Sequence, residues 1–148
     1  MTDDVDKILH LHGVDLFERL TTQQLADLAV VVDEVTVGDG ATIVSEGEFA
    51  DCMYFIVDGR VLVTKGSVVL REWGPRDYFG EMAVLDGETR SATATARGPV
   101  RLLRLAREAL LRVMDEQPAI AIAVCQTLSR RVRELLEDRE RLEGPGRG

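Results

Sequence analysis

The sequence predicts a mainly β fold with helices at both ends, and two observations carry this prediction. Nine of the 13 glycines lie between Gly38 and Gly98, at intervals that typically separate short strands. The segments on either side carry apolar residues at helical spacing. A chain of 148 residues is long enough for one domain. We therefore expect a small sandwich, roll or barrel at residues 31–105, between helices at 1–30 and at 106–143.

The expected strands are short and rich in valine, threonine and aromatic residues, as strands usually are. They are Val31–Val37, Ala41–Ser45, Met53–Val57, Arg60–Lys65, Val68–Trp73, Ser91–Arg97 and Pro99–Leu105. The pairs Asp58-Gly59 and Gly66-Ser67 are typical of two-residue hairpin turns. Each pair is therefore expected to reverse the chain between neighbouring strands.

The expected helices lie at the two ends of the chain. A short apolar-faced segment covers Asp6–Leu11, and Thr21 or Thr22 is suited to cap a helix that runs to about Val30. Two more helices are expected at Ala106–Asp115 and from Pro118 to about Glu143. The long helix carries an apolar stripe of Ile120, Val124, Leu128, Val132, Leu135 and Leu136. Its outer face carries three pairs of opposite charge, Arg130/Glu134, Arg133/Glu137 and Glu137/Arg141. The stripe fits either core packing or a partner surface. Residues 144–148 are expected to form a flexible tail.

Composition and charge exclude several classes of protein. The chain carries 18 basic and 26 acidic side chains, a net charge of −8, which disfavours a general nucleic-acid binder. Cys52 and Cys125 are the only cysteines and do not make a disulfide framework, so a reducing, cytoplasmic location is expected. No segment of the given sequence is expected to cross a membrane, and no signal peptide is expected at its acidic start.

Residues 79–96 combine the groups that a sugar phosphate needs. Gly80 permits a sharp turn after a strand, and residues 81–85 then form one helical turn whose first amides, around Met82 and Ala83, face an anion site. Arg90 follows across a loop and is suited to a bidentate grip on phosphate. Glu81 only accepts hydrogen bonds when it is ionised, so it suits a ribose hydroxyl. The alternating small residues after Arg90 leave room for a ligand.

This segment resembles the phosphate-binding cassette of cyclic-nucleotide-binding domains, the family of the bacterial catabolite activator and of the kinase regulatory subunits. The shared pattern is Phe-Gly-Glu, a small apolar helix, a short loop, an arginine and then small residues. The similarity extends to Leu16-Phe17, Gly59 and Pro118 and so covers nearly the whole chain. The resemblance implies a single domain at 1–143 with a jelly-roll-like β-roll, an N-terminal helical bundle, a short cassette helix and a long C-terminal helix.

The resemblance also implies a role for each matching residue. Arg90 binds the cyclic phosphate with Ser91 and the amides of Met82 and Ala83, and Glu81 binds the ribose 2′-hydroxyl beside Gly80. Apolar contacts to the base are expected from Val63, Leu70, Leu135 and Leu136. In two departures from the family, Thr89 replaces a proline often seen before the arginine, and Leu135 and Leu136 fall where the catabolite activator has hydroxyl residues that bind adenine. Base recognition is therefore not carried over.

We expect a non-catalytic sensor domain that signals through its C-terminal helix. Cyclic AMP is expected to be preferred over cyclic GMP, because Ser91 stands where members selective for cyclic GMP commonly have threonine. No catalytic residue, metal site or further cofactor is expected, since residues 38–98 contain no histidine. The alternative is the same fold with an empty pocket, acting as a structural or protein-interaction module.

The expected partner, besides the nucleotide, is a second copy that pairs through the C-terminal helix or an output domain fused to this chain. Direct nucleic-acid binding is not expected, because the given sequence ends five residues after Glu143 without a recognition helix.

Overall fold

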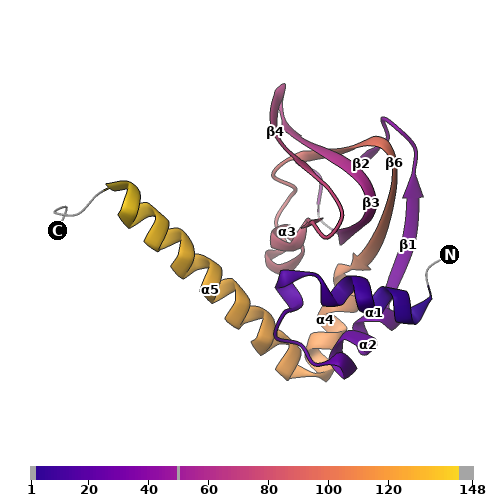
Figure 1. Cartoon of the computed structure of the whole chain (residues 1–148), viewed down its shortest axis with the longest axis vertical. Coiled ribbons are helices and arrows are strands. Elements are labelled where there is room, and N and C mark those ends of the chain that lie inside the picture. Colours follow the sequence, from indigo (N-terminus) through magenta and orange to yellow (C-terminus); the bar gives the residue numbers. More distant parts are fainter. Residues whose placement is uncertain (1–2, 50, 144–148) are drawn as a thin grey trace.

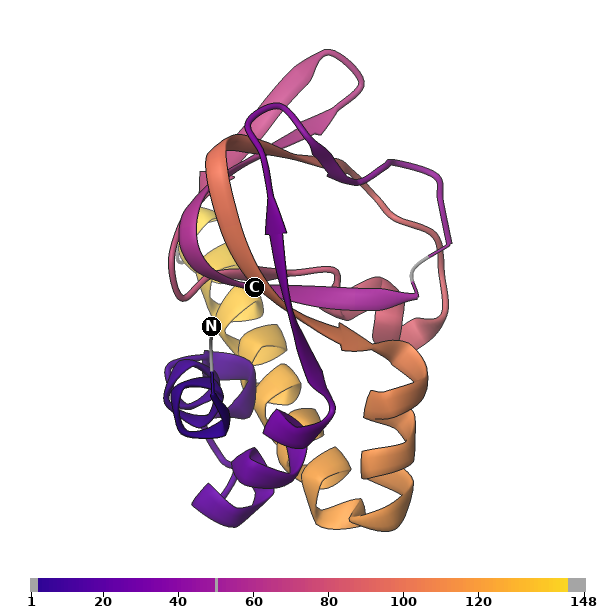
Figure 2. The ribbon, with the colours of Figure 1, turned by 90° about the vertical axis from the view of Figure 1, so that its right-hand side faces the viewer.

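Two long antiparallel strands, β3 (Cys52–Lys65) and β6 (Thr93–Ala106), organise the computed structural model, which describes residues 3–49 and 51–143. They pair from Cys52 opposite Ala106 to Thr64 opposite Thr93. The strand order is β1-β6-β3-β4, where β1 is Val32–Val37 and β4 is Val68–Trp73. The short strands β2 (Thr42–Val44) and β5 (Tyr78–Phe79) pair with β6 and β3. The strands wrap into a roll, with the main helices gathered at one end (Figures 1 and 2). A β-roll flanked by helices is therefore confirmed.

The predicted turn at Asp58-Gly59 is wrong. The chain continues through these residues as β3, and the pairing with β6 shifts register on both sides of Asp58. Gly59 has φ +100°, and a Cβ there would lie 2.5 Å from the carbonyl oxygen of Pro99. Gly98, at φ +79°, likewise lies within the continuous strand β6, so the two strands expected there are also one. The two glycines bend the paired strands β3 and β6 without ending them, because a β-bulge accommodates a glycine with positive φ as readily as a turn does.

The second turn pair is confirmed. Lys65 is paired with Val68, so Gly66 and Ser67 form the two-residue loop between β3 and β4. Gly66 has φ +59°, which this type of hairpin turn requires.

The terminal helices begin and end close to the predicted residues. They are α1 (Asp4–His12), α2 (Thr22–Val30), α4 (Arg107–Glu116) and α5 (Pro118–Glu143), with a short 3₁₀ helix η1 at Asp15–Phe17. Thr21, one of two candidates, is the N-cap of α2. Its hydroxyl accepts from Gln24 N–H at 3.1 Å, and the Gln24 side chain accepts from Thr21 N–H at 2.9 Å. The reciprocal bonds explain why the helix begins there.

Alternation along β3 divides the core into two clusters. Met53 and Phe55 pack against the helices, together with Phe17 and Ile120. Tyr54 and Ile56 point the other way and pack inside the roll, with Phe79, Ala94 and Leu102. Successive side chains of a strand face opposite sides, so one strand serves both cores. The second cluster forms the floor on which the candidate site is built.

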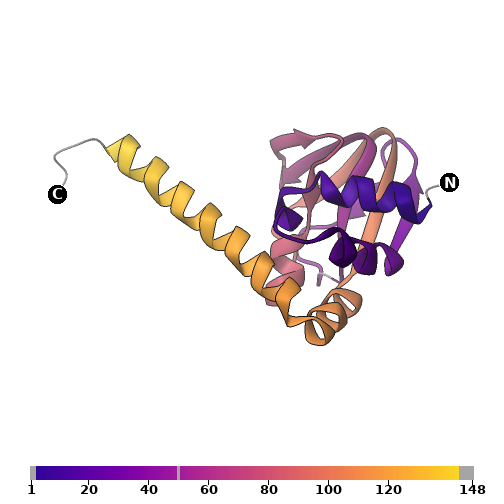
Figure 3. The ribbon, with the colours of Figure 1, turned by 60° about the horizontal axis from the view of Figure 1, so that its bottom comes forward.

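Helix α5 is anchored at one end and projects from the body at the other (Figures 1 and 3). Ile120, Ala123, Val124 and Thr127 are buried. Beyond them, Val132, Leu135, Leu136 and Leu142 are exposed. The apolar stripe is therefore core in its first half and uncovered in its second.

The tail predicted at 144–148 lies outside the described residues. Across 3–49 and 51–143 no helix has an apolar stretch long enough to span a bilayer.

Ion pairs fix the middle of α5 to the N-terminal segment. Arg130 pairs with Glu18 and, at 3.3 Å, with Glu134, and Arg131 pairs with Asp15. Of the three pairs predicted within the helix, only Arg130/Glu134 forms. Arg139 and Arg141 instead pair with Glu143 and Asp138.

Candidate functional site

A cavity of about 220 Å³ opens inside the roll, between the short helix α3 (Glu81–Asp86) and the start of β6. Seven residues singled out from the sequence line it, which are Val63, Gly80, Glu81, Met82, Ala83, Arg90 and Ser91. The segments 79–83 and 90–94 form most of the wall, and β2, β3 and β4 supply the rest. The structure therefore brings the proposed phosphate and ribose groups together in one place.

Arg90 is the buried cation of this cavity, with 6% of its surface exposed. Its Nη2 donates to the carbonyl oxygen of Cys52 at 2.6 Å, and the same atom lies 3.8 Å from the Asp51 carboxylate. Its Nη1 is buried and has no hydrogen-bond partner among the residues that the structure describes. An unpaired donor on a buried charged group costs about 1–3 kcal/mol or more, so Nη1 is a strong site for an incoming acceptor.

The backbone holds Arg90 in place on both sides. Arg90 N–H donates to Glu48 O at 2.7 Å, and Gly47 N–H donates to Arg90 O at 2.9 Å. These bonds tie the residue to the loop between β2 and β3, so the guanidinium leaves a fixed point of the wall.

Gly80 is required at the start of α3 for two separate reasons. Its φ of +88° lies in the left-handed region that side chains rarely adopt, and a Cβ there would lie 2.5 Å from Nη1 of Arg90. The absence of a side chain at Gly80 therefore makes room for the guanidinium.

The first turn of α3 lines the same cavity as this cation and carries amide groups without a partner in the helix. Val84 N–H is bonded to Gly80 O at 3.1 Å, so the amides of Met82 and Ala83 precede the first such bond and have no partner within the helix. Ala83 is buried, whereas the Met82 side chain is 72% exposed. Together with Arg90, these N–H groups make one end of the cavity a cluster of donors, which is the chemistry of an anion site.

Glu81 supplies an acceptor at the same end. Burial raises the pKa of its carboxyl, and the negative charge of Asp15 raises it further, while its own backbone N–H lowers it. The carboxyl is thus easier to protonate than usual, and an arriving hydroxyl donor favours its ionised form.

Three predicted base contacts do not line the cavity. Leu70 is 51% exposed on β4, and Leu135 and Leu136 are 68% and 54% exposed on the projecting half of α5. Val63, in contrast, is buried in the wall. The structure therefore places one of the four predicted base contacts, Val63, beside the residues predicted to bind phosphate and ribose.

Sequence reasoning missed the residues that support Arg90 and those that floor the cavity. Asp51 and Cys52 contact the guanidinium from the start of β3, and the Cys52 thiol also contacts Tyr54 Oη at 3.2 Å. Burial raises the pKa of Cys52, so this neighbour is a neutral thiol. Trp73, which the sequence places only at the end of an expected strand, lies in the cavity wall and stacks on Phe79 with ring centroids 5.5 Å apart. Only the pairing of β3 with its neighbours brings these residues to the site.

Known proteins similar to this chain share the fold and the cassette region. The model of a family described as "Cyclic nucleotide-binding domain" matches residues 34–117. A cAMP-dependent protein kinase regulatory subunit from Dictyostelium discoideum is 35% identical over 112 residues, which cover 70% of this chain and 32% of that protein. This chain covers between 30% and 59% of the length of four further curated relatives.

Solved structures agree with this assignment. The N-terminal domain of a transcriptional regulator from Streptomyces coelicolor superposes with a TM-score of 0.77 at 32% identity, and 82% of this chain and 90% of that one are covered. The regulatory domain of Toxoplasma gondii PKA, crystallised with cAMP, gives a TM-score of 0.76 at 25% identity, with 88% and 50% covered. The family match extends over more than half of the chain and includes the whole cavity wall, so this chain belongs to the cyclic nucleotide-binding domain family.

Proposed function

We propose that this chain is a cyclic AMP sensor domain that binds its ligand in the roll cavity and performs no chemistry on it. The observation that carries the proposal is the buried, unpartnered Nη1 of Arg90, next to the amides that open α3. A cyclic phosphate in this place would supply the missing acceptor and neutralise a buried charge. The regulatory domain from Toxoplasma gondii, which was crystallised with cAMP, supports this ligand class.

Most of the lining residues have a role in this proposal. Arg90, Ser91 and the amides of Met82 and Ala83 bind the phosphate, and Glu81 accepts from the ribose hydroxyl beside Gly80. Val63 packs against the base, together with Trp73. Leu70, Leu135 and Leu136 reach the base only after the β3–β4 hairpin or α5 moves toward the cavity, since all three are exposed outside it. Their contacts therefore belong to a ligand-bound arrangement.

The preference between bases is expected to be modest. Ser91 still carries a hydroxyl, and the other base contacts are apolar groups that meet similar faces of adenine and guanine. We expect cyclic AMP to bind about tenfold more tightly than cyclic GMP, a difference of about 1.4 kcal/mol.

We infer that α5 carries the signal away from the cavity. One carboxylate links the two regions, because Asp15 accepts from Tyr78 Oη at 2.6 Å and also pairs with Arg131 of α5. Tyr78 immediately precedes Phe79 and Gly80 at the cavity wall. A shift of β5 on ligand binding would therefore reach α5 through one shared acceptor.

The exposed half of α5 is suited to pair with a second copy. The exposed residues Leu135 and Leu142 lie seven residues apart and continue a repeat that begins at the half-buried Leu128, with the exposed Val132 between Leu128 and Leu135. A β-branched residue and leucine at alternating positions of a heptad favour a two-stranded coiled coil. This spacing favours a helix pair over the other expectation for α5, a fused output domain that packs on it.

Calorimetric titration with cyclic AMP, cyclic GMP and linear 5′-AMP tests the ligand. We expect cyclic AMP to bind most tightly and 5′-AMP most weakly, because the cavity of about 220 Å³ is small and suits a compact cyclic phosphate better than an extended one. Binding of none of the three would favour the alternative, a nucleotide-domain fold that serves as an interaction module. Hydrogen exchange with and without cyclic AMP tests the signal, and unchanged protection across residues 119–140 would leave a passive binder.

A further inference from the structure

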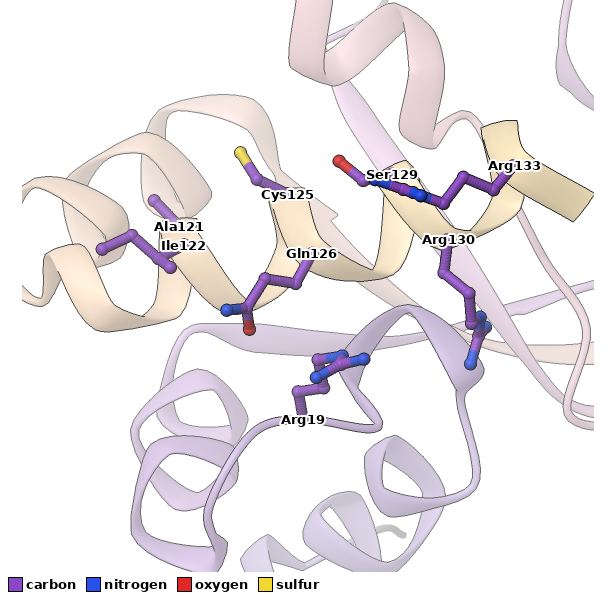
Figure 4. A pocket seen from close by; sticks show the side chains of 8 residues that line it. All are labelled: Arg19, Ala121, Ile122, Cys125, Gln126, Ser129, Arg130 and Arg133. Atoms are coloured by element: carbon purple, nitrogen blue, oxygen red, sulfur yellow. The ribbon is translucent and has the colours of Figure 1, made fainter.

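A groove of about 600 Å³ runs along the anchored half of α5, on a different surface from the cavity of the roll. Ile122, Cys125, Arg130 and Arg133 line it from the helix, and Arg19, which follows η1, forms the opposite wall. Figure 4 shows Arg19 reaching toward Gln126 and Arg130 from the N-terminal segment. The groove therefore has one wall on the helix and one on the body.

The guanidinium groups of this groove differ in their partners. Arg130 is engaged by Glu18 and Glu134. Arg19 and Arg133 form no hydrogen bond or ion pair with any residue in the described part of the chain, and Arg133 does not pair with Glu137 one turn away. Two cations without internal partners thus face one groove in a chain whose net charge is −8.

The remaining surface of the groove is largely apolar. Ile122 is 58% exposed, and Ala121 and the exposed Cys125 lie beside it. Arginines beside an uncovered aliphatic side chain match a segment that carries acidic groups around an apolar one. A nucleic acid fits less well, because the aliphatic floor of the groove offers its phosphates no contact.

We propose that this groove is the docking site for an acidic, leucine-like segment of a separate partner protein. Arg19 and Arg133 pair with its carboxylates, and Ile122 packs against its apolar side chain. The proposal goes beyond the proposed nucleotide function and does not require it. Because the walls belong to α5 and to the segment after η1, an occupant would also hold the helix against the body.

The proposal is tested by selecting short random peptides, displayed on phage, for binding to the immobilised full chain. We expect the enriched sequences to combine two or more acidic residues with an apolar one. A synthetic peptide of that sequence should bind the double variant Arg19→Glu/Arg133→Glu about tenfold more weakly than the wild-type chain, and high salt should weaken its binding to the wild type. Arg112→Glu is the matched control, because this exposed arginine of α4 pairs with no residue within 3–49 or 51–143 and lies outside the groove.

Several outcomes would overturn the assignment. Enrichment of neutral or basic peptides, or no enrichment at all, would contradict the acidic partner. Equal losses of peptide affinity in the double variant and in Arg112→Glu would contradict it as well. Tighter binding of a duplex DNA competitor would assign the groove to nucleic acid, and a lower sedimentation coefficient of the double variant alone would assign it to a second copy. A wild-type chain that binds the acidic peptide but not cyclic AMP would contradict only the proposed nucleotide function.

Discussion

Nε of Arg107, the first residue of α4, donates to the carbonyl oxygen of Val84 in α3 at a distance of 2.8 Å. This bond joins the cassette helix directly to the pair of helices that ends the chain. The Arg107 guanidinium also lies against Gly87, where α3 stops in a left-handed turn. Arg107 therefore holds the end of α3 through a hydrogen bond, whereas the Arg90 guanidinium only lies close to Gly80 at the start of the helix.

Replacing Arg107 should uncouple α3 from the C-terminal helices. Arg107→Ala leaves the partly buried Val84 carbonyl without this donor, so we expect the free energy of unfolding to fall by about 1 kcal/mol. The change in α5 hydrogen exchange on adding cyclic AMP should shrink as well. Urea denaturation and hydrogen exchange measure the two effects. Arg112→Ala, on the same helix, is the control, and equal behaviour of the two variants would show that the bond transmits nothing.

Removing the buried cation should abolish most of the ligand affinity. Arg90→Ala deletes a charge-assisted contact in a desolvated site, which should cost about 2–5 kcal/mol of binding free energy. The variant should remain folded, because the deletion also removes a buried donor that has no partner in the described residues. Calorimetry gives the affinity. Arg97→Ala, which breaks an exposed pair with Glu72, is the matched control and should bind normally; a twofold effect or less at Arg90 would contradict the site.

Glu81 should give stability and ligand affinity opposite dependences on pH. Its pKa is raised in the folded chain, chiefly by burial. Its contribution to the free energy of unfolding is therefore fully present below the unfolded pKa of about 4.3 and is lost as the pH rises through the folded pKa. Affinity should rise over the same interval, because the ionised carboxylate is the stronger acceptor for the ribose hydroxyl. Denaturation and titration across this range measure both, and Glu81→Gln should flatten both profiles. If the wild type and Glu81→Gln showed the same pH dependence of cyclic AMP affinity, Glu81 would not be the acceptor for the ribose hydroxyl.

A substitution away from the site should stabilise the fold. Arg76 has φ +78° and follows Pro75 in a turn closed by Asp77 N–H to Gly74 O at 3.0 Å. A side chain in this left-handed position costs about 1–2 kcal/mol, which glycine avoids at a smaller entropic cost. Arg76→Gly should therefore raise the free energy of unfolding by about 0.5–1 kcal/mol. Arg71→Gly, in the neighbouring strand, should lower it, and a loss of stability in both would show that the Arg76 side chain contributes more than its strain.

The projecting half of α5 should govern self-association. Leu135→Glu places a charge in the seam that the seven-residue repeat defines, so a helix-paired dimer should dissociate. Sedimentation velocity at several concentrations measures the change. Glu134→Gln, its neighbour off the seam, is the control. A wild-type chain that stays monomeric at high concentration would exclude pairing through this helix.

The helices and the cassette were predictable because their signals are local. Thr21 with Gln24 forms a cap within four residues, and residues 80–91 carry their own turn, helix and cation. The strand boundaries were less predictable, since Asp58-Gly59 signals a positive φ without saying whether the chain turns or only bends. Asp51 and Trp73 come to the site through strand pairing, which no local pattern encodes. The course of α5 depends on Arg130 and Arg131 meeting Glu18 and Asp15, residues more than a hundred positions earlier.

The position of Trp73 gives the domain a spectroscopic reporter of its own. It is the only tryptophan of the chain, it lies in the wall of the cavity, and its ring stacks on Phe79 next to Gly80. A purine that enters the cavity would displace solvent from the indole and change its emission. Occupancy is then readable from the unlabelled protein, and stopped-flow mixing would resolve the rates at which a nucleotide enters and leaves.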